Sequence, residues 1–275
     1  KLLKNIYNIG AVMFVKRDLI DFVETRNGNM YFEKAGTGFP VVLLHPLGMS
    51  TWVWKDIVGE LSNSYTTYAF DMLGHGKSDK PHAQFSIPDY AEALDDACQI
   101  LNIHRAHYVG NSVGACLASE MAARYPDRID KLILVGCPVY SPTEASVRIQ
   151  ASQNDFTEDG LPIPRTIKDL KDRTTFANPT QELLDLVNFS RTEAGSWVKH
   201  LSNSLNNYDL LARLPLIKAS KTLVLYGEED RLISGASILK NNIIRSSITT
   251  MNNVAHVPQI EAPSLFTSIL EDFLS

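Results

Sequence analysis

A serine enclosed by two glycines is the feature of this chain that points most directly to chemistry. Residues 110–114 read Gly-Asn-Ser-Val-Gly, the pattern G-x-S-x-G. An extended run at 107–109 precedes them and a helix-like run at 115–124 follows, which is the setting for a serine displayed on a sharp strand-to-helix turn. Glycine at both flanks leaves room for backbone packed around a strained turn. The sequence therefore predicts that Ser112 is a nucleophile.

A serine hydroxyl attacks poorly at neutral pH unless a base removes its proton and a carboxylate orients that base. The apolar run 222–226 predicts a buried strand, and Gly227 and three acidic residues follow it. We take Asp230 as the acid, while Glu228 and Glu229 stay as alternatives because they are adjacent in sequence. A further short strand is predicted at 247–251. His256, which comes after it, is the predicted base.

The order serine, acid, histidine is that of the α/β-hydrolase fold. The chain resembles this family over roughly residues 20 to 275, through four blocks in order. They are Val-Val-Leu-Leu-His-Pro-Leu-Gly at 41–48, Asp-Met-Leu-Gly-His-Gly-Lys-Ser at 71–78, the serine turn, and the acid and histidine segments that end in Gln-Ile-Glu-Ala-Pro at 259–263. The acid of the family most often sits three residues past the glycine, in G-x-x-D, which favours Asp230.

The resemblance also implies an oxyanion hole formed by two main-chain N–H groups, those of Leu47 and Val113. Removing one such donor typically costs about 3 to 4 kcal/mol of transition-state stabilisation. The family usually has glycine where this chain has Pro46, and proline carries no N–H. The donor is one residue later, so we expect the hole to be retained, with His45 ordering the loop by hydrogen bonding. Asp71 and His75 take a structural role in the family.

Strand-like and helix-like runs alternate along most of the chain and predict an α/β fold, with a mostly parallel central sheet covered by helices on both faces. A hairpin with its turn at Asn27-Gly28 comes first. The expected strands are 18–24, 29–35, 40–45, 66–70, 107–111, 131–136, 222–226 and 247–251, and the expected helices are 52–60, 89–101 and 113–124. In such sheets ligands bind at the carboxyl ends of the strands, where the predicted site residues fall.

Between 136 and 221 this alternation gives way to proline-rich turns and helical periodicity. We expect an α/β-hydrolase core at 17–137 and 217–275, a helical cap at 138–216, resembling the cap of this family, and an N-terminal extension at 1–16. Trp197, Leu201 and Leu205 recur at intervals of four, one face of a helix. Most of this face should pack the cap onto the sheet. Trp197 is the residue we predict to line the substrate pocket, which would be enclosed and apolar.

Composition agrees with a soluble enzyme. The 275 residues carry a net charge of −5, which gives no footprint for nucleic-acid binding. No metal-ligand spacing and no G-x-G-x-x-G occurs, so we expect neither a metal nor another cofactor. No run of eighteen apolar residues predicts a membrane span. The three cysteines are expected to be buried free thiols, and we expect a cytoplasmic location. The sequence leaves the oligomeric state open.

These features favour a cofactor-free serine hydrolase that cleaves an ester or related acyl bond of a small, largely apolar substrate through an acyl-enzyme at Ser112. A C–C bond hydrolase of the meta-cleavage-product type is an alternative, which the chain resembles through Asn111 but without that group's glycine-rich oxyanion segment at Pro46. Lactonase and perhydrolase activities would use the same triad. Some members of the fold are instead ligand receptors or signalling proteins that turn over slowly, since a fold does not determine function.

Overall fold

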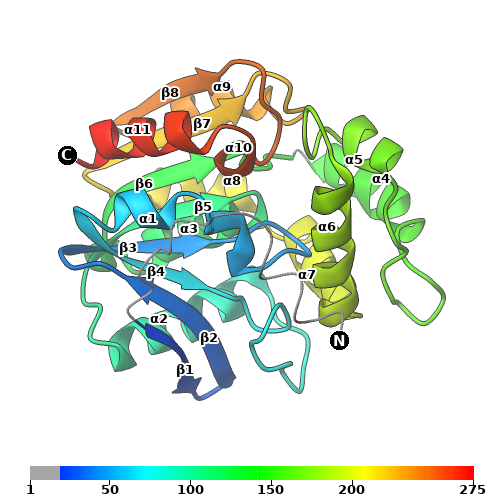
Figure 1. Cartoon of the computed structure of the whole chain (residues 1–275), viewed down its shortest axis with the longest axis horizontal. Coiled ribbons are helices and arrows are strands. Elements are labelled where there is room, and N and C mark those ends of the chain that lie inside the picture. The colour runs from blue at the N-terminus through cyan, green and yellow to red at the C-terminus, as the bar shows by residue number, and fades with distance from the viewer. Residues whose placement is uncertain (1–18, 141) are drawn as a thin grey trace.

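An eight-stranded sheet forms the centre of the computed structural model, which describes residues 19–140 and 142–275 (Figure 1). The strands lie in the order β1-β2-β4-β3-β5-β6-β7-β8, with β1, β2 and β4 paired antiparallel and every other pair parallel. Their bounds are β1 Leu19–Thr25, β2 Gly28–Ala35, β3 Phe39–Leu44, β4 Tyr65–Phe70, β5 Ala106–Asn111, β6 Ile129–Val135, β7 Lys221–Gly227 and β8 Ser246–Met251. The predicted fold class is confirmed.

The middle strands are apolar without alternation because both faces of the sheet are covered. Every residue of β5 is buried, as are six of the seven residues of β7. This is the pattern of strands in a parallel sheet between two helical layers. One layer contains α2 Ile87–Ile100, α3 Val113–Arg124, α8 Leu210–Arg213 and α9 Gly235–Asn242, and the other contains α1 Val58–Leu61, α10 Pro258–Glu261 and α11 Pro263–Leu274.

Two local features differ from the sequence-based expectation. The hairpin turn consists of Arg26 and Asn27, one residue earlier than predicted, because Gly28 is already paired with Thr25 as the first residue of β2. The helix predicted at 52–60 is a 3-10 helix, Thr51–Trp54, followed by the short helix α1. Thr51, Val53 and Trp54 of the 3-10 helix are buried, and Val58 and Leu61 are the buried residues of α1.

A long helical insertion separates β6 from β7. It contains α4 Pro142–Gln153, α5 Ile167–Asp172, α6 Gln181–Ala194, α7 Trp197–Asn206, α8 and a 3-10 helix, Leu214–Leu216. In Figure 1, α4 to α7 lie together beyond one end of the parallel strands. The insertion contributes buried side chains to the cores on both faces of the sheet. The domain boundaries given above remain a prediction, and residues 1–16 lie outside the described residues.

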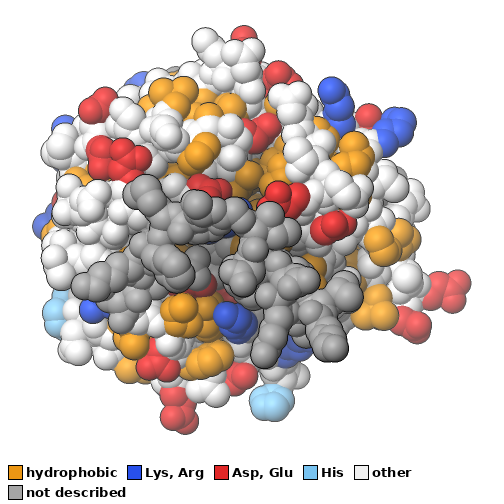
Figure 2. Space-filling view, viewed as in Figure 1, with side chains coloured by type: hydrophobic (Ala, Val, Ile, Leu, Met, Phe, Trp, Pro, Cys, Tyr) orange, Lys and Arg blue, Asp and Glu red, His pale blue; other side chains and the backbone are white. Residues whose placement is uncertain are grey.

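The surface carries charges of both signs. On the face seen in Figure 2, acidic and basic side chains of the described residues are scattered among polar and apolar ones. Among the described helices, none has the length and apolar character needed to cross a lipid bilayer. The described residues also contain no group of three or more His, Cys, Asp or Glu side chains that could hold a metal ion.

Candidate active site

The predicted nucleophile occupies a strained turn between β5 and α3. Ser112 has φ 59° and ψ −119°, a combination that non-glycine residues rarely adopt. Its N–H donates a hydrogen bond of 2.8 Å to the carbonyl of Val135 on the neighbouring strand. A Cβ atom at Gly110 would lie 2.1 Å from the Gly114 carbonyl oxygen, and one at Gly114 would lie 2.3 Å from that of Leu44. Both glycines are therefore required by close backbone contact.

The predicted acid and base are in direct contact. Nδ1 of His256 lies 2.8 Å from Oδ2 of Asp230, which is only 2% exposed. The other carboxylate oxygen accepts the N–H of Leu232 at 2.9 Å, so both oxygens of Asp230 are engaged. Glu228 and Glu229, the alternatives open at the sequence level, are exposed. The geometry selects Asp230 as the partner of the histidine.

Gly136, which follows β6, provides the space for this pair. A Cβ atom there would lie 2.8 Å from Nδ1 of His256 and 2.9 Å from Oδ2 of Asp230. The residue also has φ +53°, in the left-handed region that favours glycine. A side chain at this position would push the histidine away from its carboxylate.

Asn111 connects the serine turn to the histidine loop. Its side-chain amide donates to the carbonyl of His256 at 3.0 Å and to that of Val135 at 3.1 Å, and its oxygen accepts a hydrogen bond of 3.0 Å from Gln259. Among the described residues no hydrogen bond joins the half-buried Ser112 hydroxyl to His256. Such contacts are often longer before substrate binds. Sequence reasoning had noted Asn111 only as a family likeness and missed this bridging role.

The predicted oxyanion donors have no competing acceptor in the part of the chain that the structure describes. Neither the Leu47 N–H nor the Val113 N–H is hydrogen-bonded within the described parts of the chain. Hydrogen bonds of His45 explain the orientation of the Leu47 N–H. Its Nε2 accepts the Met72 N–H at 2.9 Å, so Nδ1 carries the proton and donates to the Pro46 carbonyl at 2.9 Å. In a planar trans peptide the following N–H, that of Leu47, points the opposite way from this carbonyl.

The two histidines beneath the site are uncharged at neutral pH. Complete burial lowers the pKa of His45 to about 4, against an opposing effect of the Pro46 hydrogen bond. Burial and the neighbouring His45 lower the pKa of His75 to about 3. A neutral His45 is the form that can accept from one ring nitrogen and donate from the other. The prediction that His45 orders the loop by hydrogen bonding is therefore confirmed.

Asp71 supports the same loop from below. Its carboxylate accepts the N–H of Thr51 at 2.7 Å and that of Lys77 at 2.9 Å. Burial raises the pKa of Asp71 to about 6, although these hydrogen bonds favour the charged form. A Cβ atom at Gly76 would lie 2.0 Å from Oδ2, so the glycine allows the turn to close around the carboxylate. The arrangement is structural, as expected.

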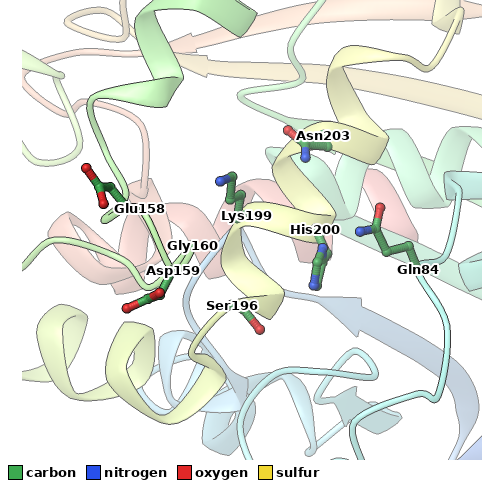
Figure 3. A pocket seen from close by; sticks show the side chains of 8 residues that line it. All are labelled: Gln84, Glu158, Asp159, Gly160, Ser196, Lys199, His200 and Asn203. Carbon is green, nitrogen blue, oxygen red and sulfur yellow. The ribbon is translucent and has the colours of Figure 1, made fainter.

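Trp197 begins α7 and covers the turn at Gly74. The side chain is 8% exposed, and a Cβ atom at Gly74 would lie 2.8 Å from the indole ring. The ring also meets His200 edge-on, with 5.0 Å between centroids. Contact with substrate stays a prediction. A separate hollow of about 330 Å³ includes Glu158, Asp159, Lys199 and His200 along α7, and neither Ser112 nor Trp197 lines it (Figure 3).

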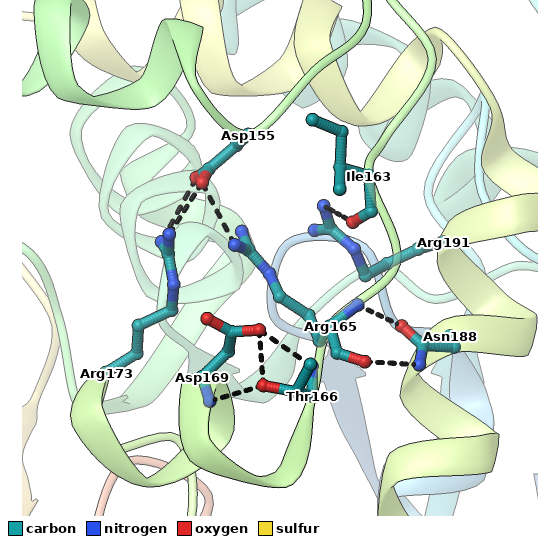
Figure 4. A network of polar contacts seen from close by, with 8 residues as sticks. All are labelled: Asp155, Ile163, Arg165, Thr166, Asp169, Arg173, Asn188 and Arg191. Atoms are coloured by element: carbon teal, nitrogen blue, oxygen red, sulfur yellow. Dashed lines mark hydrogen bonds and ion pairs between the residues drawn. The ribbon is translucent and has the colours of Figure 1, made fainter.

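Three arginines of the insertion, Arg165, Arg173 and Arg191, belong to one network of polar residues (Figure 4). Asp155 accepts hydrogen bonds from Arg165 at 2.9 Å and from Arg173 at 2.6 Å. Arg191, only 7% exposed, has no carboxylate partner in the described part of the chain. One of its terminal nitrogens lies 3.5 Å from the carbonyl of Ile163, and its Nε has no hydrogen-bond partner among residues 19–140 and 142–275.

Arg191 is thus a buried cation in contact with the oxyanion loop. A Cβ atom at Gly48 would lie 3.1 Å from its Cγ and 3.5 Å from its guanidinium. Burial and the neighbouring Arg165 lower the pKa of Arg191 to about 10, so the group keeps its charge at neutral pH. An unpaired guanidinium in such a place is suited to hold a carboxylate. No motif in the sequence indicated it.

The fold and this arrangement of side chains define a hydrolase of the α/β class. The amino-acid sequence matches the family described as alpha/beta hydrolase fold over residues 40–263, and the chain belongs to this family.

Relatives with known activities are similar over most of the chain. The 2-hydroxymuconate semialdehyde hydrolase of Pseudomonas sp. (strain CF600) is 27% identical over 271 aligned residues, covering 88% of each protein.

An uncharacterised protein of Mycobacterium tuberculosis (strain ATCC 25618 / H37Rv) is 34% identical over 128 residues. That match covers 46% of this chain but only 38% of the mycobacterial protein, so the chain spans well under half of that relative.

Solved structures agree on the fold. A membrane phospholipase A, a bacterial virulence factor, has a TM-score of 0.84 at 24% identity and covers 99% of this chain and 90% of its own. A meta-cleavage product hydrolase has a TM-score of 0.76 at 24% identity, and the match covers 92% of this chain and 97% of that hydrolase. Because these identities are below 25%, the likeness establishes the architecture rather than the substrate.

Proposed function

We propose that this protein is a serine hydrolase that cleaves an ester or related acyl bond of a small substrate. Ser112 attacks the carbonyl carbon while His256 takes its proton, and Asp230 orients the imidazole and stabilises its charged form. The N–H groups of Leu47 and Val113 hold the developing oxyanion. Return of the proton to the leaving group gives an acyl-enzyme, and water then repeats the sequence to release the acid.

The observation that carries this proposal is the 2.8 Å contact between His256 and a buried Asp230, beside a serine held in a strained turn. Strained backbone of this kind persists where the surrounding structure over-determines it, often at active sites. The free N–H groups at Leu47 and Val113 complete the set of parts that acyl transfer requires.

The test is hydrolysis of a series of p-nitrophenyl esters of increasing acyl length, with Ser112→Ala as the matched inactive variant. We expect turnover on the order of 1 to 1000 per second for the preferred ester. Ser112→Ala should retain the fold and lose activity by a factor of at least about 10³. Tight binding of an ester analogue with almost no turnover would instead indicate a receptor, and full activity in Ser112→Ala would refute the nucleophile.

A second candidate is a C–C bond hydrolase of the meta-cleavage-product type, and Arg191 is the observation that favours it. Substrates of the kind named for the Pseudomonas relative carry a carboxylate, and the unpaired guanidinium beside Gly48 is placed to bind one. The buried charge of Arg191 also argues against a wholly apolar substrate pocket. Simple esters and lactones have no free carboxylate for such a cation to bind.

The two candidates differ in how Arg191 contributes. For a substrate with a free carboxylate, Arg191→Gln should raise KM at least about tenfold, the loss of one charge-assisted contact. Hydrolysis of p-nitrophenyl acetate should change less than about threefold. Arg173→Gln, which removes a partner of Asp155, is the control for general damage to the insertion. Equal effects of Arg191→Gln on charged and neutral substrates would remove the support for this candidate.

A further inference from the structure

The loop between α5 and α6 reaches back to both segments that carry the proposed acid and base. The carbonyl of Thr174 accepts the main-chain N–H of His256 at 3.1 Å. The hydroxyl oxygen of Thr174 accepts the N–H of Arg231, the residue after Asp230, at 3.0 Å. One residue of the insertion therefore touches the main chain of the base and of the residue next to the acid.

Thr174 adopts a backbone conformation that its residue type disfavours. Its φ is +52°, in the left-handed region, where a β-branched residue is a genuine outlier. Its own hydroxyl donates to the carbonyl of Arg173 at 2.7 Å. Strain of this kind is retained only where neighbouring contacts hold the residue in place. The hydrogen bonds to His256 and Arg231 help to do so, together with the C-terminal turn of α5, where the N–H of Thr174 donates to the Lys171 carbonyl at 2.9 Å.

A second connection runs through Glu261, which follows the histidine on α10. One carboxylate oxygen accepts the N–H of Ala177 in the same loop of the insertion, at 2.6 Å. The other accepts the N–H of Ala255, the residue before His256, at 2.7 Å. Hydrogen bonds to a carboxylate are among the stronger ones in proteins. Glu261 thus binds the insertion and the histidine segment together.

We propose that Thr174 and Glu261 are positioning residues that set the main chain of His256 from the insertion. This inference rests on the proposed function of His256. The N–H groups of residues 255 and 256 are both held by these contacts, so the insertion determines where the imidazole stands relative to Asp230 and Ser112. A displacement of about 1 Å in a catalytic group can cost about a hundredfold in rate.

The test compares Glu261→Ala and Thr174→Gly with the wild-type protein. Glu261→Ala removes both carboxylate contacts, while Thr174→Gly keeps the carbonyl, accepts φ +52° readily and loses only the hydroxyl contact. We expect kcat for p-nitrophenyl acetate to fall about tenfold to a hundredfold in Glu261→Ala, with KM changed less than threefold. Thr174→Gly should lose less, about twofold to tenfold. Glu261→Gln, which keeps one acceptor oxygen, should recover part of the loss.

A spectroscopic measurement separates positioning from general stability. The proton shared by His256 and Asp230 should give a low-field proton NMR signal, which we expect to shift or broaden in Glu261→Ala. Asp169→Asn is the matched control, since Asp169 caps α5 in the same insertion through Thr166 and is not among the contacts to the histidine segment. It should lower the melting temperature while kcat and the signal stay unchanged.

Each outcome decides the proposal. If Glu261→Ala and Thr174→Gly keep kcat within twofold while Ser112→Ala is inactive, the positioning role is refuted and the proposed function stands. If Asp169→Asn lowers kcat as much as Glu261→Ala does, the effect is one of stability and the positioning role is again refuted. Should Glu261→Ala fail to fold, Thr174→Gly and Glu261→Gln provide the same comparison. Activity that survives Ser112→Ala would refute the proposed function itself.

Discussion

Replacement of Asp230 by asparagine gives the sharpest test of the proposed triad, because both oxygens of this carboxylate are engaged. Oδ1 accepts the Leu232 N–H at 2.9 Å and Oδ2 faces Nδ1 of His256 at 2.8 Å. Asparagine has one oxygen and one NH₂ group. The Leu232 N–H can only donate, so the amide oxygen should turn toward it and the NH₂ group toward His256. Nδ1 must then act as an acceptor, and the proton moves to Nε2.

That tautomer cannot take the proton of Ser112. The corresponding change in other serine triads lowers kcat by about 10⁴, which is about 5 kcal/mol at 1.36 kcal/mol per tenfold. Shape and volume are conserved, so we expect Asp230→Asn to fold. Steady-state hydrolysis of the preferred p-nitrophenyl ester measures the loss, and Glu229→Gln, an exposed neighbour, should change kcat less than twofold. A kcat of Asp230→Asn within tenfold of wild type, or a large loss in Glu229→Gln, would refute this assignment.

Two further predictions concern Trp197 and Asp71. Truncation of buried Trp197 to alanine should lower the free energy of unfolding by about 3 to 5 kcal/mol. If kcat/KM for long esters rises relative to acetate, Trp197 lines the pocket. If activity toward all esters falls equally, Trp197 packs against Gly74. For Asp71, the folded pKa of about 6 lies above the ordinary value of 3.8, so burial of the carboxylate costs stability above pH 6 and nothing below pH 4. The stability lost in Asp71→Asn should therefore shrink by up to about 3 kcal/mol between pH 4 and pH 7 in urea unfolding, and a loss independent of pH would contradict the raised pKa.

The parts of the site that depend on local backbone geometry were predictable from the sequence. The serine turn, the helix after it and the strands beside it follow from short-range pattern, since two glycines and a change of periodicity are visible along the chain. The helix at 113–124 has the bounds expected of it. The sequence favoured Asp230 through its place three residues past Gly227, and the structure adds that it is buried against His256 while Glu228 and Glu229 are exposed.

The supporting contacts were not predictable, for a physical reason. Thr174 acts on His256 through its main-chain carbonyl, a group that every residue carries, so its side chain gives no signal. Glu261 and Arg191 act across distances of 84 and 143 residues along the chain, to Ala177 and to the loop at Gly48. Such pairs are set by how the insertion packs, and periodicity within a single segment holds no information about it. The hairpin turn was predicted one residue too late for a similar reason, because the pairing register of a hairpin depends on both of its strands.

The position of the insertion has a consequence for how the active site comes into being. Ser112 and both proposed oxyanion donors precede it in the chain, whereas Asp230 and His256 follow it. The two portions meet where β7 pairs in parallel with β6, with Val224 opposite Leu134. During synthesis the proposed nucleophile is therefore made well before the proposed acid and base, and the proposed hydrolysis should begin only after β7 and β8 have joined the sheet. Cutting the chain within the insertion would give two inert halves whose recovered ester hydrolysis measures their reassembly.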